Sequence, residues 1–169
     1  MTDHRHQDSA KQNEQLGNPS YLRNMFGRFA SGVTVVSCDV GGSVHAMTAN
    51  SFVSVSLDPA RALVSVARSA KMHTLLNEGC GFGVSILKDG QASVSNHFAG
   101  RPADGGLPEF KHVAGVPVLA DALAWMVCCP DRQFDVDDHT LFVGRLLDCG
   151  YQDNVEPLLF FGGKYAALK

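Results

Sequence analysis

Hydrophobic and polar residues alternate along much of this chain, and the alternation predicts a protein built mainly from β-strands. The clearest case is the alternation of Val53, Val55 and Leu57 with Ser54 and Ser56. A strand in this segment directs the branched apolar side chains to one face and the hydroxyls to the other. We therefore expect the three apolar side chains to face a core.

Similar runs of β-branched or alternating residues predict further strands. The run Val33–Val36 is followed by Gly41 and Gly42, a turn signal, and by a second run from Val44, so this region is expected to form a hairpin. In the last third of the chain, aromatic residues at strand spacing are expected in the core: Trp125, Phe142 and Phe160. The remaining predicted strands span residues 62–67, 82–87, 122–129, 140–148, 158–161 and 164–168.

Three short helices are predicted between these strands. The first begins at Asn18-Pro19-Ser20 and continues to Gly32, and the second is capped by Ser69 and ends at Glu78. A third is expected at 91–98. Residues 99–117, which contain three prolines and four glycines, are predicted to form a long loop of the kind that often binds a ligand.

The length of 169 residues suits one domain with a continuous core. Residues 1–17 contain a single leucine, so we expect a disordered polar tail followed by a domain at 18–169. Because strands outnumber helices and follow one another closely, the expected fold is mainly β with short helices, a closed or nearly closed antiparallel barrel.

Charge and cysteine content exclude several classes of protein. A net charge of −3 provides no basis for binding nucleic acid or an anionic membrane, and the apolar runs are too short to span a bilayer. With no secretory leader in the first residues, a cytoplasmic location is expected. The five cysteines are odd in number and form no C-x-x-C pair, which argues against a disulfide framework and a structural zinc site.

The segment 46–59, AMTANSFVSVSLDP, is the strongest candidate for a binding site. It carries six hydrogen-bonding side chains and no charge before Asp58. Small neutral donors and acceptors at Thr48, Asn50 and Ser51 would let a flat ligand with heteroatoms at its edge approach the backbone. The alternative is an exposed strand and turn with ordinary polar residues.

Two charged segments are weaker candidates. The residues Arg68-Ser69-Ala70-Lys71 at a predicted helix start favour a phosphate, and His73 could add a donor there; the alternative is a solvated surface helix. The segment 135–140 places carboxylates beside His139. No second histidine stands at ligand spacing, so an acidic turn with His139 at the ligand edge is preferred to a metal site. Neither a dinucleotide-binding glycine motif, nor a P-loop, nor a G-x-S-x-G nucleophile motif is present.

Several collinear motifs make the chain resemble the flavin reductase family, the NAD(P)H-dependent reductase components of two-component flavin monooxygenases. The resemblance extends from about Tyr21 to Leu168. The motifs are FGRFASGVTVV at 26–36, AMTANSFVSVSLDP at 46–59, LVSVARSAKMHTLL at 63–76, HFAG at 97–100, GVPVLADALAWMVC at 115–128, DHTLFVGRL at 138–146 and PLLFFGGKY at 157–165.

The resemblance implies an FMN-binding split β-barrel that is usually a homodimer. It also implies hydride transfer from NADH, or less commonly NADPH, to FAD or FMN, with the reduced flavin passing to a separate monooxygenase or halogenase. By the same similarity His139 would be the catalytic residue and would lie, with Tyr165, where the nicotinamide nucleotide docks. The flavin would be bound by Thr48, Ala49, Asn50, Ser51, Ser54, Ser65, Val66, Arg68, Lys71, His73 and Phe98.

One segment departs from the family pattern. Many relatives end in aromatic-x-Arg-Gly-Arg-Tyr, whereas this chain has Gly162 at the first arginine position and Lys164 at the second. Lysine lacks the planar fork of arginine, so contacts with the pyridine nucleotide could differ. The residues also leave open a binding protein for flavin or haem without turnover, and an enzyme that retains its flavin to reduce another acceptor.

Overall fold

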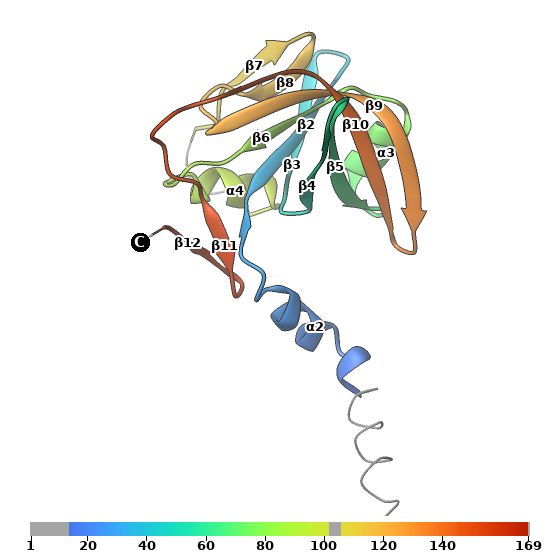
Figure 1. The fold of residues 1–169 in the computed structure, drawn as a ribbon, viewed down its shortest axis with the longest axis vertical. Helices are drawn as coiled ribbons and strands as arrows, with labels where there is room; N and C mark the ends of the chain where they lie inside the picture. The colour runs from blue at the N-terminus through green and yellow to red at the C-terminus, as the bar shows by residue number, and fades with distance from the viewer. Residues whose placement is uncertain (1–13, 102–105, 169) are drawn as a thin grey trace, which may run out of the picture.

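The computed structural model describes residues 14–101 and 106–168, and an antiparallel sheet of seven strands forms its body (Figure 1). The order across the sheet is β3-β2-β6-β9-β10-β5-β4. The tail expected at 1–17 lies mostly outside the described residues, so its division from the domain stays a prediction. The strands are β2 (Thr34–Val40), β3 (Ser43–Ala49), β4 (Phe52–Leu57), β5 (Ala60–Ala67), β6 (Phe82–Ile86), β9 (Ala124–Val136) and β10 (His139–Tyr151).

The two edge strands of this sheet, β3 and β4, are consecutive in the chain. Only Asn50 and Ser51 join them, so the sheet curves until its edges meet without pairing. This is the split barrel that the sequence led us to expect, and the expectation is confirmed. The split falls inside the neutral segment 46–59, so the fold itself brings the candidate residues to the barrel edge.

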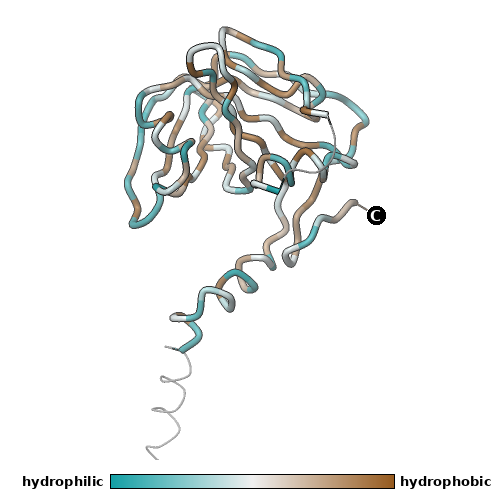
Figure 2. Tube along the Cα trace, turned by 180° about the vertical axis from the view of Figure 1, so that it is seen from behind, coloured by the Kyte–Doolittle hydropathy of each residue, from teal (hydrophilic) through white to brown (hydrophobic). Residues whose placement is uncertain are grey.

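The predicted hairpin at 33–49 is confirmed. Strands β2 and β3 pair from Thr34 with Ala49 to Val40 with Ser43, and the turn places Gly41 and Gly42 at φ of 61° and 83°. Such positive φ angles are strained for residues with a Cβ atom, which is why two glycines stand at the turn. Figure 2 shows hydrophobic segments along the strands and hydrophilic ones in connecting turns.

Helices cover or flank the barrel. Helix α2 (Pro19–Phe26) is capped by the Asn18 side chain and projects away from the barrel, whereas α3 (Lys71–Asn77) packs Met72, Leu75 and Leu76 into the core. Helix α4 (Ala92–Phe98) lies near the C-terminal hairpin. The first helix ends at Phe26, so the prediction that it continues to Gly32 was wrong. The predicted Ser69 cap was also wrong, because Ala70 is the N-cap residue of α3 and makes no side-chain hydrogen bond.

Two further expectations about strands need correction. Val53, Val55 and Leu57 do not face the core; their exposed fractions are 52%, 49% and 94%, because β4 is an edge strand with a bulge near Val55. The region 99–117, expected as a loop, contains β7 (Phe110–Val113) and the start of β8 (Val116–Leu119), which form a hairpin. Residues 102–105 of that region lie outside the described part.

A small three-stranded sheet stands beside the barrel. It consists of β1 (Ser31–Gly32), β11 (Leu159–Phe161) and β12 (Lys164–Ala166), in the order β1-β11-β12. The turn of its hairpin places Gly162 and Gly163 at φ of 59° and 80°. Of the aromatic residues predicted in the core, Phe142 is buried, and Trp125 and Phe160 are partly buried against the second core cluster.

Candidate functional site

A pocket of about 270 Å³ opens where strand β3 ends, beside the split of the barrel. Three elements build its walls: the end of β3 with Asn50, the helix α4 with the residues after it, and the C-terminal hairpin. The lining is apolar or neutral except for one guanidinium. Its members are Val33, Thr48, Ala49, Asn50, Ser95, Asn96, Ala99, Arg101, Phe160 and Tyr165.

The predicted residues Thr48, Ala49, Asn50 and Tyr165 therefore share one pocket, although more than 100 residues separate Tyr165 from the other three in the chain. Asn50 is exposed and Ala49 buried, so at these two positions the amide side chain and the backbone are what a ligand can contact. The Thr48 hydroxyl donates to the backbone carbonyl of Ser95 over 2.6 Å. Its proton is thus committed, and toward a ligand this oxygen can only accept.

Ser51 and Ser65 hold the other side of the split together. The Ser51 hydroxyl donates to the Ser65 carbonyl over 2.7 Å, and the Ser65 amide donates back to the Ser51 carbonyl over 3.4 Å. Ser54 lies farther along β4 and is exposed. These contacts give Ser51 a fixed geometry next to Asn50 and Thr48.

A planar ring with hydrogen-bonding edges fits the chemistry of this region. A smaller cavity of about 110 Å³ adjoins the pocket, because Asn50 lines both, and Ser31 lines the smaller one. Among the described residues, Ser31 Oγ is the buried side-chain polar atom without a hydrogen-bond partner. An unpaired buried hydroxyl costs free energy, so a donor or acceptor from a ligand would stabilise the site.

The predicted phosphate side forms a hydrogen-bonded chain. Thr140 Oγ1 donates to Asp135 Oδ1 over 2.8 Å and lies 2.9 Å from His73 Nε2. A hydroxyl has one proton, so His73 must donate from Nε2, which fixes its tautomer. The other oxygen of Asp135 pairs with Arg68 at 3.1 Å. Arg68 is thereby oriented, but its charge is partly offset.

Lys71 stands at the start of α3, on the side of the β2–β3 hairpin. It lines a cavity of about 160 Å³ together with His45. Burial, and secondarily the charge of Lys71, lower the pKa of His45, so that imidazole is neutral at pH 7. Lys71 is therefore the cation of this cavity at neutral pH.

His139 lies at the first residue of β10, paired in register with Ala67. Its Nδ1 is 2.7 Å from Asp138 Oδ1, and this hydrogen bond lowers the pKa of the Asp138 carboxyl. The acidic turn expected at this point is confirmed, since β9 ends at Val136 and β10 begins at His139. His139 does not line the pocket that holds Tyr165, so the two residues do not share this pocket within one chain.

Two of the predicted flavin-binding side chains point elsewhere. Val66 is fully buried in the main core cluster, so only its backbone could reach a ligand. Phe98 packs in the second cluster, with its ring edge-on to Phe110 at 5.8 Å between centroids, and it does not line the pocket. His97, edge-on to Phe98, is likewise a packing residue.

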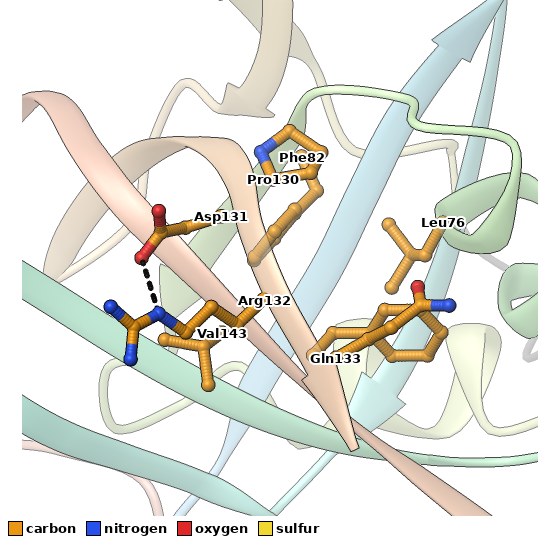
Figure 3. A pocket seen from close by; sticks show the side chains of 8 residues that line it. Leu76, Phe82, Pro130, Asp131, Arg132, Gln133 and Val143 are labelled. Atoms are coloured by element: carbon orange, nitrogen blue, oxygen red, sulfur yellow. Dashed lines mark ion pairs between the residues drawn. The ribbon is translucent and has the colours of Figure 1, made fainter. Parts of the chain in front are cut away.

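A second pocket of about 210 Å³ lies between α3 and the β9–β10 hairpin (Figure 3). It lies where β9 and β10 shift register between Val143 and Gly144, a shift that leaves Asp131 out of the ladder. Asp131 pairs with Arg61 and lies 3.9 Å from Arg132, and the bond with Arg61 lowers the pKa of the Asp131 carboxyl. No residue predicted to bind flavin lines this pocket.

Sequence reasoning missed Ser95, Asn96 and Arg101 as pocket residues. The available signal was the pair Ser95-Asn96 directly before the HFAG motif, because two poor helix formers stand inside a short helix. Among residues 14–101 and 106–168, no group of three or more His, Cys, Asp or Glu side chains is placed to hold a metal ion. The same residues contain no helix long and apolar enough to cross a membrane.

The split barrel and its pocket, uncharged except for Arg101, define a protein suited to a planar heteroaromatic ligand. Comparison with known families specifies the class. Residues 26–169 match the flavin reductase like domain. The chain therefore belongs to the flavin reductase family, and the resemblance inferred from its motifs is confirmed.

Individual relatives agree over most of their length. An NADH-dependent flavin reductase from Rhodococcus sp is 44% identical over 154 residues, covering 89% of this chain and 87% of the relative. The styrene monooxygenase flavin reductase from Pseudomonas putida S12 superposes with a TM-score of 0.81 at 42% identity, covering 88% and 97%. BorF, the flavin reductase component of a bacterial two-component tryptophan halogenase, gives a TM-score of 0.81 at 42% identity, covering 89% and 98%.

Proposed function

We propose that this protein is an NADH-dependent flavin reductase that reduces FAD or FMN and releases the reduced flavin to a separate monooxygenase or halogenase. The observation that carries the proposal is the pocket at the barrel split, which is uncharged except for Arg101, in a chain similar to proteins named as flavin reductases. The halogenase and monooxygenase partners of two relatives support the destination of the product. A cytoplasmic location is part of the proposal.

The residues at the split are suited to hold the ring of the flavin. Asn50 offers an amide at the exposed edge, Thr48 offers an acceptor, and Ser51 is fixed against Ser65. When bound, the flavin supplies the acceptor for the hydride of NADH. The protein contributes orientation and neutral hydrogen bonds, so no strong base is needed in the pocket.

The phosphate end is assigned to Arg68, Lys71 and His73. Arg68 and His73 are both tied to Asp135, His73 through Thr140, and the Arg68 guanidinium remains half exposed, with 49% of its side chain accessible. A phosphate can therefore replace Asp135 as the partner of Arg68, or bind Arg68 beside it. His139, hydrogen-bonded to Asp138 at the start of β10, is assigned to the nicotinamide nucleotide.

We further propose that the functional unit is a homodimer. Residues paired directly across neighbouring strands share a face, and the register puts Val53, Leu63, Leu141, Phe134 and Val136 on the face of β4, β5, β10 and β9 opposite the core residues Val64 and Phe142. Val53, Phe134 and Val136 are about half exposed.

An apolar sheet face of this kind favours burial against a partner. Ser65 and His139 belong to the same face by register. A second copy on this face would complete the surroundings of both residues. The same arrangement would explain why His139 and Tyr165 share no pocket within one chain.

Retention of the flavin tests the diffusible-product part of the proposal. Purified protein is mixed with one equivalent of FAD or FMN, reduced by NADH under anaerobic conditions and passed through a desalting column. We expect the reduced flavin to separate from the protein. A flavin that stays with the protein after reduction would contradict release to a partner and would favour an enzyme that retains its flavin to reduce another acceptor.

A further inference from the structure

Ser95 occupies an unusual position for a serine, in the middle of helix α4 and almost fully buried, with 1% of its surface exposed. A serine inside a helix commonly turns to solvent or bonds to the carbonyl one turn earlier. The Ser95 hydroxyl instead lies 2.9 Å from the hydroxyl of Tyr165 on strand β12, 70 residues away. The side chain thus joins two elements that the chain does not connect locally.

The direction of the hydrogen bonds follows from counting protons. The Tyr165 hydroxyl also lies 2.9 Å from Asn96 Oδ1, an oxygen that can only accept. Because a phenol has one proton, both contacts are satisfied when Tyr165 donates to Asn96 and Ser95 donates to Tyr165. Ser95 is therefore the donor that fixes the Tyr165 oxygen, and the aromatic ring with it.

The backbone carbonyl of the same residue serves the opposite wall of the pocket. It accepts the Thr48 hydroxyl at 2.6 Å and the Ala99 amide at 3.0 Å. Thr48, Ser95 and Tyr165 all line the pocket at the barrel split. One buried residue thus contacts the strand that borders the proposed flavin site through its carbonyl. Through its hydroxyl it contacts Tyr165, the residue that the family resemblance places at the nicotinamide nucleotide.

We propose that Ser95 is a positioning residue for the reductase reaction, which orients Tyr165 toward the nicotinamide nucleotide and Thr48 toward the flavin. The inference rests on the function proposed above. The two contacts of Ser95 can be tested separately, because replacing Ser95 with alanine removes the hydroxyl that contacts Tyr165 and leaves the carbonyl that contacts Thr48. Alanine is smaller than serine and is the better helix former, so this variant should fold, with the gain in helix propensity offsetting part of the lost Ser95–Tyr165 hydrogen bond.

The test compares Ser95→Ala with Ser93→Ala, the same substitution on an exposed position of the same helix. The dissociation constant for NAD⁺ is measured by calorimetry and that for flavin by fluorescence quenching, both without turnover. For Ser95→Ala we expect NAD⁺ binding and the KM for NADH to weaken about fivefold, the loss of one neutral hydrogen bond. The dissociation constant for flavin should match that of Ser93→Ala, and Tm should fall only by the small amount that one lost hydrogen bond accounts for.

A double-mutant cycle shows whether Ser95 acts through Tyr165. Tyr165→Phe should produce a similar weakening, and Ser95→Ala combined with it should be no worse than either single variant. Additive effects, or a change in flavin binding with NAD⁺ binding intact in Ser95→Ala, would overturn the assignment. If wild-type protein shows no flavin-dependent NADH oxidation, the proposed function fails. If the wild type turns over but Ser95→Ala binds NAD⁺ as tightly as Ser93→Ala does, this inference alone fails.

Discussion

Thr140 Oγ1 donates to Asp135 Oδ1 over 2.8 Å and accepts from His73, so one buried hydroxyl links helix α3 to the β9–β10 hairpin. Thr140 is fully buried. Replacing it with valine keeps the shape but removes both bonds and leaves the His73 donor unpaired. We expect Thr140→Val to lower the free energy of unfolding by about 1–3 kcal/mol, as measured by urea denaturation.

The control for this substitution is Thr74→Val, because Thr74 is exposed and lies on the same helix as His73. It exchanges the same side chains without a buried partner, so its effect should stay within about 0.5 kcal/mol. Equal stability of the Thr140 variant and wild type would mean that the hydrogen-bonded chain contributes nothing to the fold.

Asn50 is predicted to contribute directly to flavin binding. Asn50→Ala removes an exposed amide at the pocket edge and should weaken flavin binding by roughly 1 kcal/mol, or about fivefold, with little change in Tm. Ser51→Ala should also weaken flavin binding by about this amount, but it should lower stability too, because the Ser51 hydroxyl bonds to the Ser65 carbonyl. Fluorescence quenching measures the affinity of each variant for FMN and FAD, and thermal melts measure its stability, so together they distinguish Asn50→Ala from Ser51→Ala. An Asn50→Ala variant with unaltered flavin affinity would remove Asn50 from the site.

His139 is expected to act at the nicotinamide step. His139→Ala should raise the KM for NADH or slow hydride transfer, measured by stopped-flow flavin bleaching under anaerobic conditions. The dissociation constant for flavin should remain close to that of wild type. A collapse of flavin affinity with an unchanged KM for NADH would show that the roles are assigned wrongly.

The exposed sheet face is predicted to hold the dimer together. Val53→Asp and Phe134→Asp place charges on that face and should shift the protein from dimer to monomer in sedimentation velocity experiments. Val40→Asp is a matched control, since Val40 is also about half exposed but belongs to the β2–β3 hairpin. Wild-type protein that sediments as a monomer at micromolar concentration would contradict the homodimer.

Buried thiols should make the protein less stable at alkaline pH. Burial raises the pKa of Cys128 from its ordinary value of 9.0 to about 12. The unfolded chain therefore loses this proton first, and the stabilising contribution is complete below pH 9 and is lost as the pH rises toward 12. Thermal melts between pH 7 and pH 11 should show a steeper decline for wild type than for Cys128→Ala. Parallel curves would exclude this thiol as the source.

The sequence was sufficient to predict most strands because their apolar residues alternate or run continuously, as in 33–49 and 82–87. It failed at β4, where alternation was read as a core strand. Val53, Val55 and Leu57 form the same pattern whether they face their own core or a second chain. Periodicity identifies the apolar face of a strand but does not identify what covers that face.

The site was predictable only in part for a similar reason. The neutral segment around Thr48 and Asn50 was identified from side-chain chemistry alone. Ser95 was missed because its role depends on Tyr165, which approaches only after the C-terminal hairpin has packed beside α4. Val66 alternates with Ser65 in β5 and its side chain is buried, whereas the family resemblance implied that it binds the flavin.

The central claim is tested most directly by the initial rate of NADH oxidation at 340 nm with purified protein, without added flavin and then with FMN, FAD and riboflavin. The account predicts saturable turnover that depends on added flavin, and the ranking of the three would identify the preferred one. Absence of turnover with every flavin, with both NADH and NADPH, would contradict a reductase and leave a flavin- or haem-binding protein as the better explanation.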